Sequence, residues 1–356
     1  MSLAPTGTVV AQQANYYRVQ LDAAQSLPLT ILLCTRRARL KKIGQQVMVG
    51  DRVVVEEPDW EGGRGAIAEV LPRQSELERP AVANANQILL VFSLAEPELD
   101  AHQLSRFLVK AESTGIEPCV CLNKSDLISS QELVEVRENL LDWGYEPIFV
   151  SVKQQTGLDQ LSEQLAGQIT IVCGPSGVGK SSIINYLIPG VKQRVGEVSG
   201  KLNRGRHTTR HVELFELPLG GLLADTPGFN QPDLTCTQSE LAGFFPEARQ
   251  RLSEASCQFS DCLHRDEPNC AVRGDWERYE DYLEFLEEVT DWQQALQHQG
   301  DAESTLKIKS KLKGSQEYEP KLNTKKYRRT SRRSQIQKLQ DISQTDEWEE
   351  NEEDLD

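Results

Sequence analysis

The sequence predicts a multidomain protein with an N-terminal β-barrel of the OB-fold type, a central α/β domain, a C-terminal helical zinc-binding domain and a disordered charged tail. Three observations support this prediction. Short apolar segments broken by glycine and proline fill the first 75 residues, apolar runs alternate with helix-length segments up to residue 231, and four soft metal ligands lie within fourteen residues after position 256. The predicted boundaries are 1–75, 80–231, 232–298 and 299–356.

The first domain is predicted from short strands. Segments such as 16–21 and 51–56 are rich in β-branched and aromatic residues, and Gly50 and Pro58 separate them from their neighbours. Five or so strands in this length suit a small Greek-key barrel such as the OB-fold.

The second domain is predicted from strand and helix alternation. Apolar runs at 88–94, 118–122, 148–152 and 169–173 are separated by segments long enough for helices. This pattern is typical of a parallel sheet with crossover helices. Ligands bind such sheets at the carboxyl ends of the strands, and the motifs described next each follow a strand.

A phosphate-binding loop is predicted after the run at 169–173. The segment from Gly174 to Ser181 fits the pattern G-x-x-x-x-G-K-[ST], whose glycines let backbone N–H groups converge on phosphate oxygens. Lys180 is expected to reach the β- and γ-phosphates, and Ser181 to offer its hydroxyl to Mg²⁺. The alternatives are a chance match or a different NTPase. The expected phosphate-binding residues are Gly174, Pro175, Ser176, Gly177, Val178, Gly179, Lys180, Ser181 and Ser182.

A guanine-reading segment is predicted at Asn123-Lys124-Ser125-Asp126. The carboxylate of Asp126 can accept hydrogen bonds from the ring N–H and the exocyclic amine of guanine, whereas adenine would leave it unpaired. Asn123 is expected to hold the loop and Lys124 to lie along the base. Such a tetrapeptide is a weak signal alone, but here it accompanies a phosphate loop. Ser151, in Ser151-Val152-Lys153, is a candidate to complete the base pocket.

A metal-side motif and a switch loop are predicted further along the chain. Asp225-Thr226-Pro227-Gly228 places Asp225 where it can hold Mg²⁺ through water and the Gly228 N–H where it can meet the γ-phosphate. Upstream, the segment 205–210 contains His207 and Thr208, and the Thr208 hydroxyl is a candidate Mg²⁺ ligand. An ordinary basic loop is the alternative for this segment.

The order of these motifs is unusual. In ordinary GTPases the phosphate loop precedes the base reader, whereas here the base reader at 123–126 comes first. Circular permutation moves the termini of a domain without moving its site. We therefore expect a circularly permuted GTPase domain, in which movement of the metal-side motif can be passed to the domain that follows.

A zinc site is predicted after position 256. The pattern Cys-x4-Cys-x-His-x5-Cys supplies three thiolates and one imidazole, and four soft ligands with no open position indicate a structural tetrahedral Zn²⁺ site. Core cysteines are the alternative, but the surrounding residues are mostly polar. The predicted ligands are Cys257, Cys262, His264 and Cys270.

The distribution of charge matters more than its sum. The net charge of −15 disfavours a nucleic-acid partner, but Arg36 to Lys42 carries five cations in seven residues. In the tail, Lys321 to Lys338 has eight basic residues and no acid, and Asp341 to Asp356 has nine acids and no base. We expect nucleic-acid contact through the first run, and the alternative is a strand edge whose basic residues serve only solubility. The residues concerned are Arg36, Arg37, Arg39, Lys41 and Lys42.

The remaining composition is that of a cytoplasmic protein. No stretch is long and apolar enough to span a membrane, and the first residues lack a signal-peptide pattern. Eight cysteines without such a signal indicate thiols or metal ligands rather than disulfides.

The permuted motif order, the N-terminal barrel and the Cys/His cluster together resemble the ribosome small-subunit-dependent GTPase family, RsgA or YjeQ, over about residues 5–298. The resemblance implies that GTP is hydrolysed under stimulation by the small (30S) ribosomal subunit, late in its maturation, as an assembly checkpoint. It also implies contact with 16S rRNA through the barrel and zinc domain. We further expect the protein to be a monomer. The chain departs from the family pattern at Val152, where alanine is more usual, and in its long tail.

Two other functions are compatible with these motifs. In the first, the protein is an rRNA-binding scaffold that holds GTP with negligible turnover. In the second, it is a permuted GTPase of the large subunit, against which the barrel and the zinc cluster argue. Phe229 occupies the position that a water-orienting glutamine takes in many GTPases, so intrinsic hydrolysis is expected to be slow and His207 is the candidate to orient the water.

Overall fold

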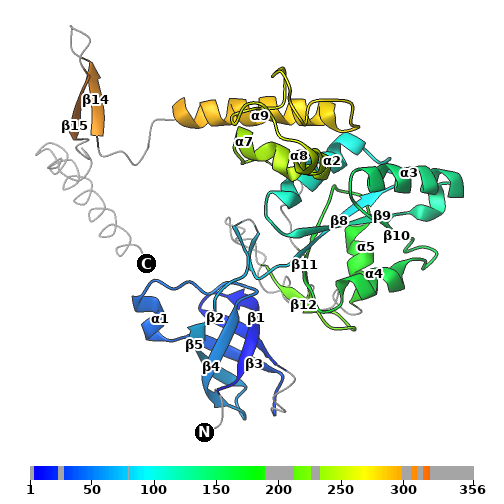
Figure 1. Ribbon diagram of the computed structural model, residues 1–356. Helices are drawn as coiled ribbons and strands as arrows, with labels where there is room; N and C mark the ends of the chain where they lie inside the picture. Colours follow the sequence, from blue (N-terminus) through cyan, green and yellow to red (C-terminus); the bar gives the residue numbers. More distant parts are fainter. Residues whose placement is uncertain are drawn as a thin grey trace, which may run out of the picture. The chain divides into compact units, whose positions relative to one another are not determined.

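The structure is a computed structural model that describes residues 4–22, 28–78, 80–188, 212–225 and 233–298, together with the backbone of 306–310 and 316–320 (Figure 1). It divides into one compact unit from Met1 to Gln293 and a second from Gln294 to Asp356. Among the described residues, no helix is both long and apolar enough to cross a membrane.

The N-terminal domain is a closed five-stranded barrel with the strand order β1-β2-β3-β5-β4, which confirms the predicted OB-type barrel. Strand β3 runs parallel to β5, and the other neighbours are antiparallel. Alternate residues point inward, so that Val9, Val19 and Leu32 form part of a buried core. The short helix α1, Ala38–Lys42, follows β3. The strands are β1 Thr6–Gln13, β2 Tyr16–Leu21, β3 Ile31–Arg36, β4 Arg52–Asp59 and β5 Arg64–Val70.

The central domain is a six-stranded sheet in the order β10-β9-β8-β11-β13-β12, parallel except for the β12 edge. Strand β8, Gln87–Ser93, is buried along its whole length, as expected for a strand covered on both faces. A small hairpin of β6, Glu76–Glu78, and β7, Ala81–Ala83, precedes it. The other strands are β9 Glu117–Asn123, β10 Ile148–Phe149, β11 Ile169–Cys173, β12 Leu214–Glu216 and β13 Leu222–Asp225.

Helices cover both faces of this sheet (Figure 1). Helices α2, Ala101–Glu112, and α3, Ser130–Asp142, pack on the face that presents Ile88 and Leu90. Helices α4, Leu158–Leu165, and α5, Lys180–Leu187, pack on the face that presents Leu89 and Val91. Strand β11, which precedes the phosphate loop, lies in the middle of the sheet, although β8, β9 and β10 of the same sheet come before it in the chain. This arrangement is the permuted order in three dimensions.

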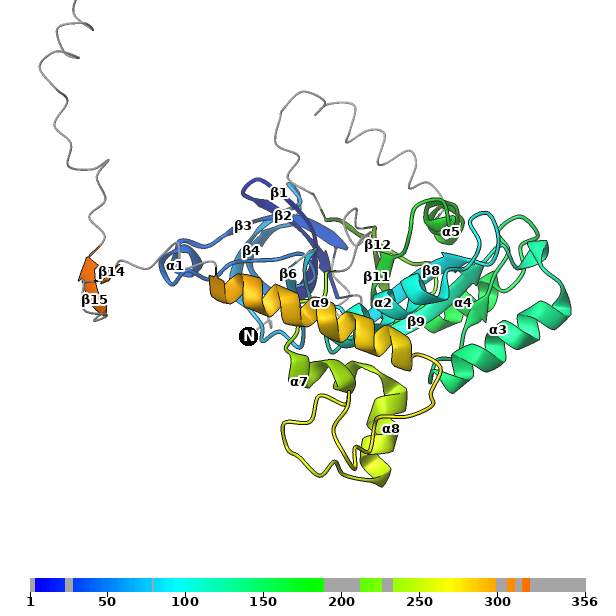
Figure 2. The same ribbon diagram turned by 90° about the horizontal axis from the view of Figure 1, so that it is seen from above.

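The C-terminal domain is helical, as predicted, and packs against α2 of the central domain (Figure 2). Its core is built on Phe245, Tyr282 and Phe285, and Val109 of α2 belongs to the same cluster. Helix α9 begins at Tyr279 and carries two acidic residues in its first turn, Glu280 and Asp281. Its elements are α7 Gln238–Leu241, the 3-10 helix η3 Ala242–Phe244, α8 Pro246–Glu254 and α9 Tyr279–His298.

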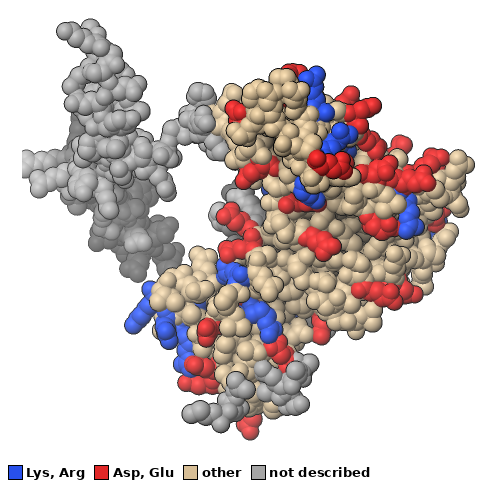
Figure 3. All heavy atoms as spheres, in the orientation of Figure 1, with Lys and Arg blue, Asp and Glu red and all other residues tan. Residues whose placement is uncertain are grey.

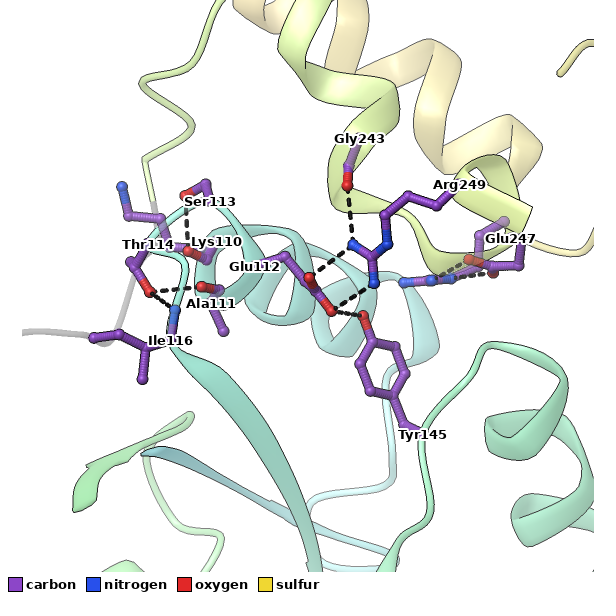
Figure 4. A network of polar contacts seen from close by, with 11 residues as sticks. Lys110, Ala111, Glu112, Ser113, Thr114, Ile116, Tyr145, Gly243, Glu247 and Arg249 are labelled. Carbon is purple, nitrogen blue, oxygen red and sulfur yellow. Dashed lines mark hydrogen bonds and ion pairs between the residues drawn. The ribbon is translucent and has the colours of Figure 1, made fainter. Parts of the chain in front are cut away.

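Polar contacts join this helical domain to the central domain (Figure 4). Glu112, at the end of α2, accepts hydrogen bonds from Tyr145 Oη at 2.9 Å and from Arg249 Nη1 of α8 at 2.8 Å. His102 Nδ1 of α2 lies 2.8 Å from an Asp281 oxygen of α9. The two domains therefore contact each other through both apolar and charged side chains.

The tail was expected to lack regular structure after residue 299. Within it the structure describes β14, Leu306–Ser310, and β15, Gln316–Pro320, which pair in an antiparallel ladder. The remaining residues of the tail, including both charge blocks, lie outside the described part of the chain.

Candidate nucleotide-binding site and metal centre

The predicted nucleotide motifs meet at one edge of the sheet. Strands β8, β9, β10, β11 and β13 are parallel, so their carboxyl ends face the same side. A cavity of about 420 Å³ opens there between the loop after β8, the base reader after β9, the loop after β10 and the phosphate loop after β11. Its lining includes Glu96, Asn123, Lys124, Asp126, Leu127, Val152, Lys153, Gly179 and Ser182.

Asn123 ties the base reader to the phosphate loop. Its Nδ2 donates a hydrogen bond to the Val178 carbonyl at 2.9 Å, and the side chain is buried. Gly179 makes this contact possible because a Cβ there would lie 2.2 Å from Asn123 Nδ2. The two motifs are 55 residues apart in the chain, and this bond sets their spacing.

Lys124 and Asp126 are held in place by their neighbours. Lys124 has a left-handed φ of 61°, and its Nζ donates to the carbonyls of Glu96 and of Gly177, the latter at 3.2 Å. Ser151 Oγ donates to Asp126 Oδ1 at 2.6 Å and accepts from the Gln154 N–H at 3.0 Å. Because Ser151 is fully buried, its hydroxyl is shielded from water and stays directed at the Asp126 carboxylate.

The phosphate loop has the backbone that its glycines allow. Gly174 has a φ of 139°, and a Cβ there would lie 2.1 Å from the Val91 carbonyl oxygen. Helix α5 begins after Gly179 without a side-chain cap, which leaves N–H groups of its first turn for a ligand. The ammonium of Lys180 donates to the carbonyl of Gly174 at 2.8 Å and to that of Pro175, so it lies over the loop where phosphate oxygens would bind.

The metal-side motif is only partly described. Asp225 ends β13 and pairs in register with Val172 of β11, which places its backbone one strand away from the phosphate loop. The predicted site residues His207, Thr208 and Gly228 lie outside the described residues.

The four predicted zinc ligands converge. One donor atom from each of Cys257, Cys262, His264 and Cys270 lies within 4.8 Å of all the others. His264 Nδ1 is 3.5, 3.4 and 3.3 Å from the sulfurs of Cys257, Cys262 and Cys270, and the Cys257 and Cys270 sulfurs are 3.9 Å apart. A tetrahedron with Zn–S bonds of about 2.3 Å has edges of about 3.8 Å, so the donor set fits a zinc ion.

The surroundings of the cluster also suit a metal. The N–H groups of Ala271 and Arg273 point at the sulfurs of Cys257 and Cys270, at 3.4 and 3.2 Å, which favours thiolates. Burial lowers the pKa of His264 and so favours the neutral imidazole that binds metals. Tyr279 Oη fixes the His264 carbonyl at 2.8 Å.

Comparison with known proteins identifies the family. Residues 70–235 match the model of the RsgA GTPase family. A protein of Trichormus variabilis named small ribosomal subunit biogenesis GTPase RsgA is 64% identical over 360 residues, which cover 96% of this chain and 97% of that protein. The chain belongs to the RsgA GTPase family. A Synechocystis relative of the same name is 55% identical over 357 residues, covering 96% of each chain.

Solved structures of RsgA-like proteins confirm the architecture. The structure of YloQ, described as a circularly permuted GTPase, is 32% identical with a TM-score of 0.68 and covers 81% of this chain and 96% of its own. That of YjeQ from Thermotoga maritima has the same identity and TM-score and covers 81% and 99%. As an RsgA GTPase, this chain has a guanine nucleotide as its ligand and Mg²⁺ as its ion.

The basic run on the barrel of this RsgA GTPase divides into two parts. Arg36 Nη1 donates to the Gln45 carbonyl at 2.6 Å, and Arg37 pairs with Glu57 at 2.7 Å, so both are engaged within the protein. The other three cations are exposed residues of α1, namely Arg39, Lys41 and Lys42. Within the described residues none of these three forms an ion pair. Basic side chains gather over α1 at the lower left of Figure 3, whereas acidic ones dominate over α2 and α3.

Two residues of the cavity were not foreseen from the sequence: Glu96 and Leu127. Leu127 directly follows the base reader. Glu96 lies in the loop after β8. The apolar run of β8 could have indicated this loop, because the carboxyl end of a buried parallel strand lies beside those of its neighbours, here β9 and β11.

Proposed function

We propose that this protein hydrolyses GTP in the late maturation of the small (30S) ribosomal subunit, as a cytoplasmic monomer that acts as an assembly checkpoint. The names of its relatives support the subunit, and the shared cavity of base reader and phosphate loop supports the nucleotide. The observation that carries the proposal is the Asn123–Val178 hydrogen bond, because it holds the two motifs at the two ends of one ligand.

Guanine is selected by Asp126. Ser151 occupies one of its oxygens from within the protein and so aims the carboxylate, which then accepts from the donors on the Watson–Crick edge of guanine. Adenine lacks this pair of donors and would leave the carboxylate unpaired. Lys124 lies along the base, and Asn123 holds the loop.

The phosphates bind to the loop from Gly174 to Ser182 at the N-terminus of α5, with Lys180 turning from the loop carbonyls to the β- and γ-phosphates. Ser181 and Thr208 are the proposed Mg²⁺ ligands, with Asp225 holding the ion through water and the Gly228 N–H meeting the γ-phosphate. The ion, when bound, neutralises phosphate charge.

His207 is proposed to orient the attacking water, since Phe229 cannot form a hydrogen bond through its side chain. Contact with the ribosomal subunit would bring the imidazole to the γ-phosphate. His207→Ala should then lose most of the ribosome-stimulated turnover while it keeps GTP affinity and 30S binding. Stimulated turnover within a few-fold of the parent protein would rule out this role.

Contact with 16S rRNA is proposed through the basic run and the zinc domain. Because Arg36 and Arg37 are bound to groups within the protein, we expect most of the phosphate contacts to come from Arg39, Lys41 and Lys42. Their joint replacement by alanine should weaken 30S binding. It should also reduce the slope of the logarithm of the binding constant against the logarithm of salt concentration by about 2 to 3, at about 0.7–0.9 per phosphate contact. An unchanged salt dependence of 30S binding would show that these barrel residues do not contact the RNA.

Two measurements test the function as a whole. Multiple-turnover phosphate release should rise several-fold or more when 30S subunits are added, and sedimentation should show binding to 30S rather than 50S particles. Negligible turnover with 30S bound would instead indicate a GTP-binding rRNA scaffold. Binding to 50S particles alone would indicate a large-subunit factor.

A further inference from the structure

Glu96 lies where the base reader meets the phosphate loop. Its carbonyl accepts a hydrogen bond from Lys124 Nζ, and the same ammonium reaches the Gly177 carbonyl at 3.2 Å. The next residue, Pro97, is fixed by a hydrogen bond from Ser93 Oγ to its carbonyl at 2.7 Å. Pro97 also faces the phosphate loop, since a Cβ on Gly177 would lie 3.7 Å from its Cδ.

Within the described residues, the carboxylate of Glu96 forms no hydrogen bond or ion pair. The side chain is exposed and lines the nucleotide cavity. Asp126, the other acid of the cavity, is already oriented by Ser151. Glu96 is therefore a second carboxylate that is open to a ligand.

A carboxylate at this place must meet the sugar of a nucleotide. It repels phosphate groups, so it can lie beside a nucleotide only where that ligand offers hydrogen-bond donors. With the base at Asp126 and the phosphates at the loop, the covalent order of a nucleotide places the ribose between them, next to Lys124 and Glu96. The vicinal hydroxyls of ribose are two neutral donors that a carboxylate accepts well, as in dinucleotide-binding domains.

We propose that Glu96 binds the ribose hydroxyls of the guanine nucleotide and makes this protein select ribonucleotides over 2′-deoxyribonucleotides. This inference rests on the proposed nucleotide site, and it assigns specificity at the sugar to a residue outside the known motifs. Because the backbone carbonyl of Glu96 holds Lys124, replacement of its side chain leaves that contact in place.

The test compares sugar variants of one ligand. The full-length protein, Glu96→Ala and Glu96→Gln are titrated with GDP, 2′-deoxy-GDP and 2′,3′-dideoxy-GDP, by calorimetry or by competition against a fluorescent guanine nucleotide. The unaltered protein should bind GDP more tightly than 2′-deoxy-GDP, and about tenfold more tightly than the dideoxy analogue, as expected for charge-assisted hydrogen bonds. Glu96→Ala should bring this ratio close to one, mainly through weaker GDP binding, and Glu96→Gln should give an intermediate ratio.

The matched control is Glu98→Gln, which removes the same charge from an exposed position of the same loop that does not line the cavity. Its ratio should equal that of the unaltered protein. An undiminished ratio in Glu96→Ala, or an equal loss in Glu98→Gln, would overturn the inference and leave the guanine site intact. Failure of the unaltered protein to bind any guanine nucleotide would overturn the proposed function with it.

Discussion

Arg278 is a buried cation on which the packing of the helical domain depends. Its side chain is 1% exposed, and it donates to Glu247 of α8 at 2.7 and 2.5 Å. Its guanidinium also lies 4.8 Å from the ring centre of Trp143 and 5.0 Å from that of Phe245. Trp143 follows α3 of the central domain, so one side chain joins α8, the start of α9 and the neighbouring domain.

Arg278→Ala should therefore destabilise the protein by about 3–5 kcal/mol, because it leaves the carboxylate of Glu247 buried without a partner. Glu247 is only 10% exposed, so water cannot replace the lost guanidinium without local opening. The lost contacts with the rings act in the same direction. The cost should appear in the helical domain and in the segment around Trp143 rather than in the barrel.

Urea unfolding followed by tryptophan fluorescence, together with hydrogen exchange of α8 and α9, measures this effect. Arg137→Ala is the control, since Arg137 pairs with Glu146 at the surface, where both side chains are more than half exposed, and the loss should stay below about 1 kcal/mol. The double variant Arg278→Met, Glu247→Leu should recover most of the stability because no buried charge remains. A loss below about 1 kcal/mol in Arg278→Ala would refute the reasoning.

Three further predictions follow from the sites and the domain contact. Cys262→Ser should lose the bound zinc, measured by atomic absorption, and loosen the helical domain, since a structural zinc site contributes directly to folding. The hydrogen bond to Asp281 raises the pKa of His102 in the folded protein. The stability gained from the protonated imidazole is therefore fully present below the unfolded pKa of about 6.5, and it is lost as the pH rises through the higher folded pKa. His102→Gln should accordingly cost less than about 1 kcal/mol at acid pH, because His102 is 42% exposed, and should cost less at alkaline pH than at acid pH in parallel urea titrations. Gly179→Ala should weaken nucleotide binding by at least about tenfold, because its φ is 99° and the new Cβ meets Asn123.

Each of these predictions has a contrary outcome. Unchanged zinc content in Cys262→Ser would remove that cysteine from the ligand set. A His102→Gln defect that grows toward alkaline pH would contradict the sign of the pKa shift. Gly243→Ala is the control for the glycine variant, since its Cβ meets open space, and equal nucleotide affinity in both variants would contradict the steric argument.

The fold class and the motifs could be predicted from the sequence because each depends on neighbours along the chain. Alternating apolar residues form the strands of the barrel, the glycines at 174–179 set the backbone of the phosphate loop, and four ligands within fourteen residues can close on one metal ion. The motif order alone predicted the permutation, which the position of β11 in the sheet confirms.

Only the tertiary structure decided which distant side chains share a cavity. The sequence could not separate Arg36 and Arg37, which bind within the protein, from the three cations that stay exposed, because their partners lie on other segments. It likewise could not bring Glu96 to Lys124, 28 residues away, or bury Arg278 against Trp143. Such contacts depend on sheet register and domain packing, which are properties of the whole folded chain. Local spacing thus determined the chemistry of the motifs, and long-range packing determined which other residues join them.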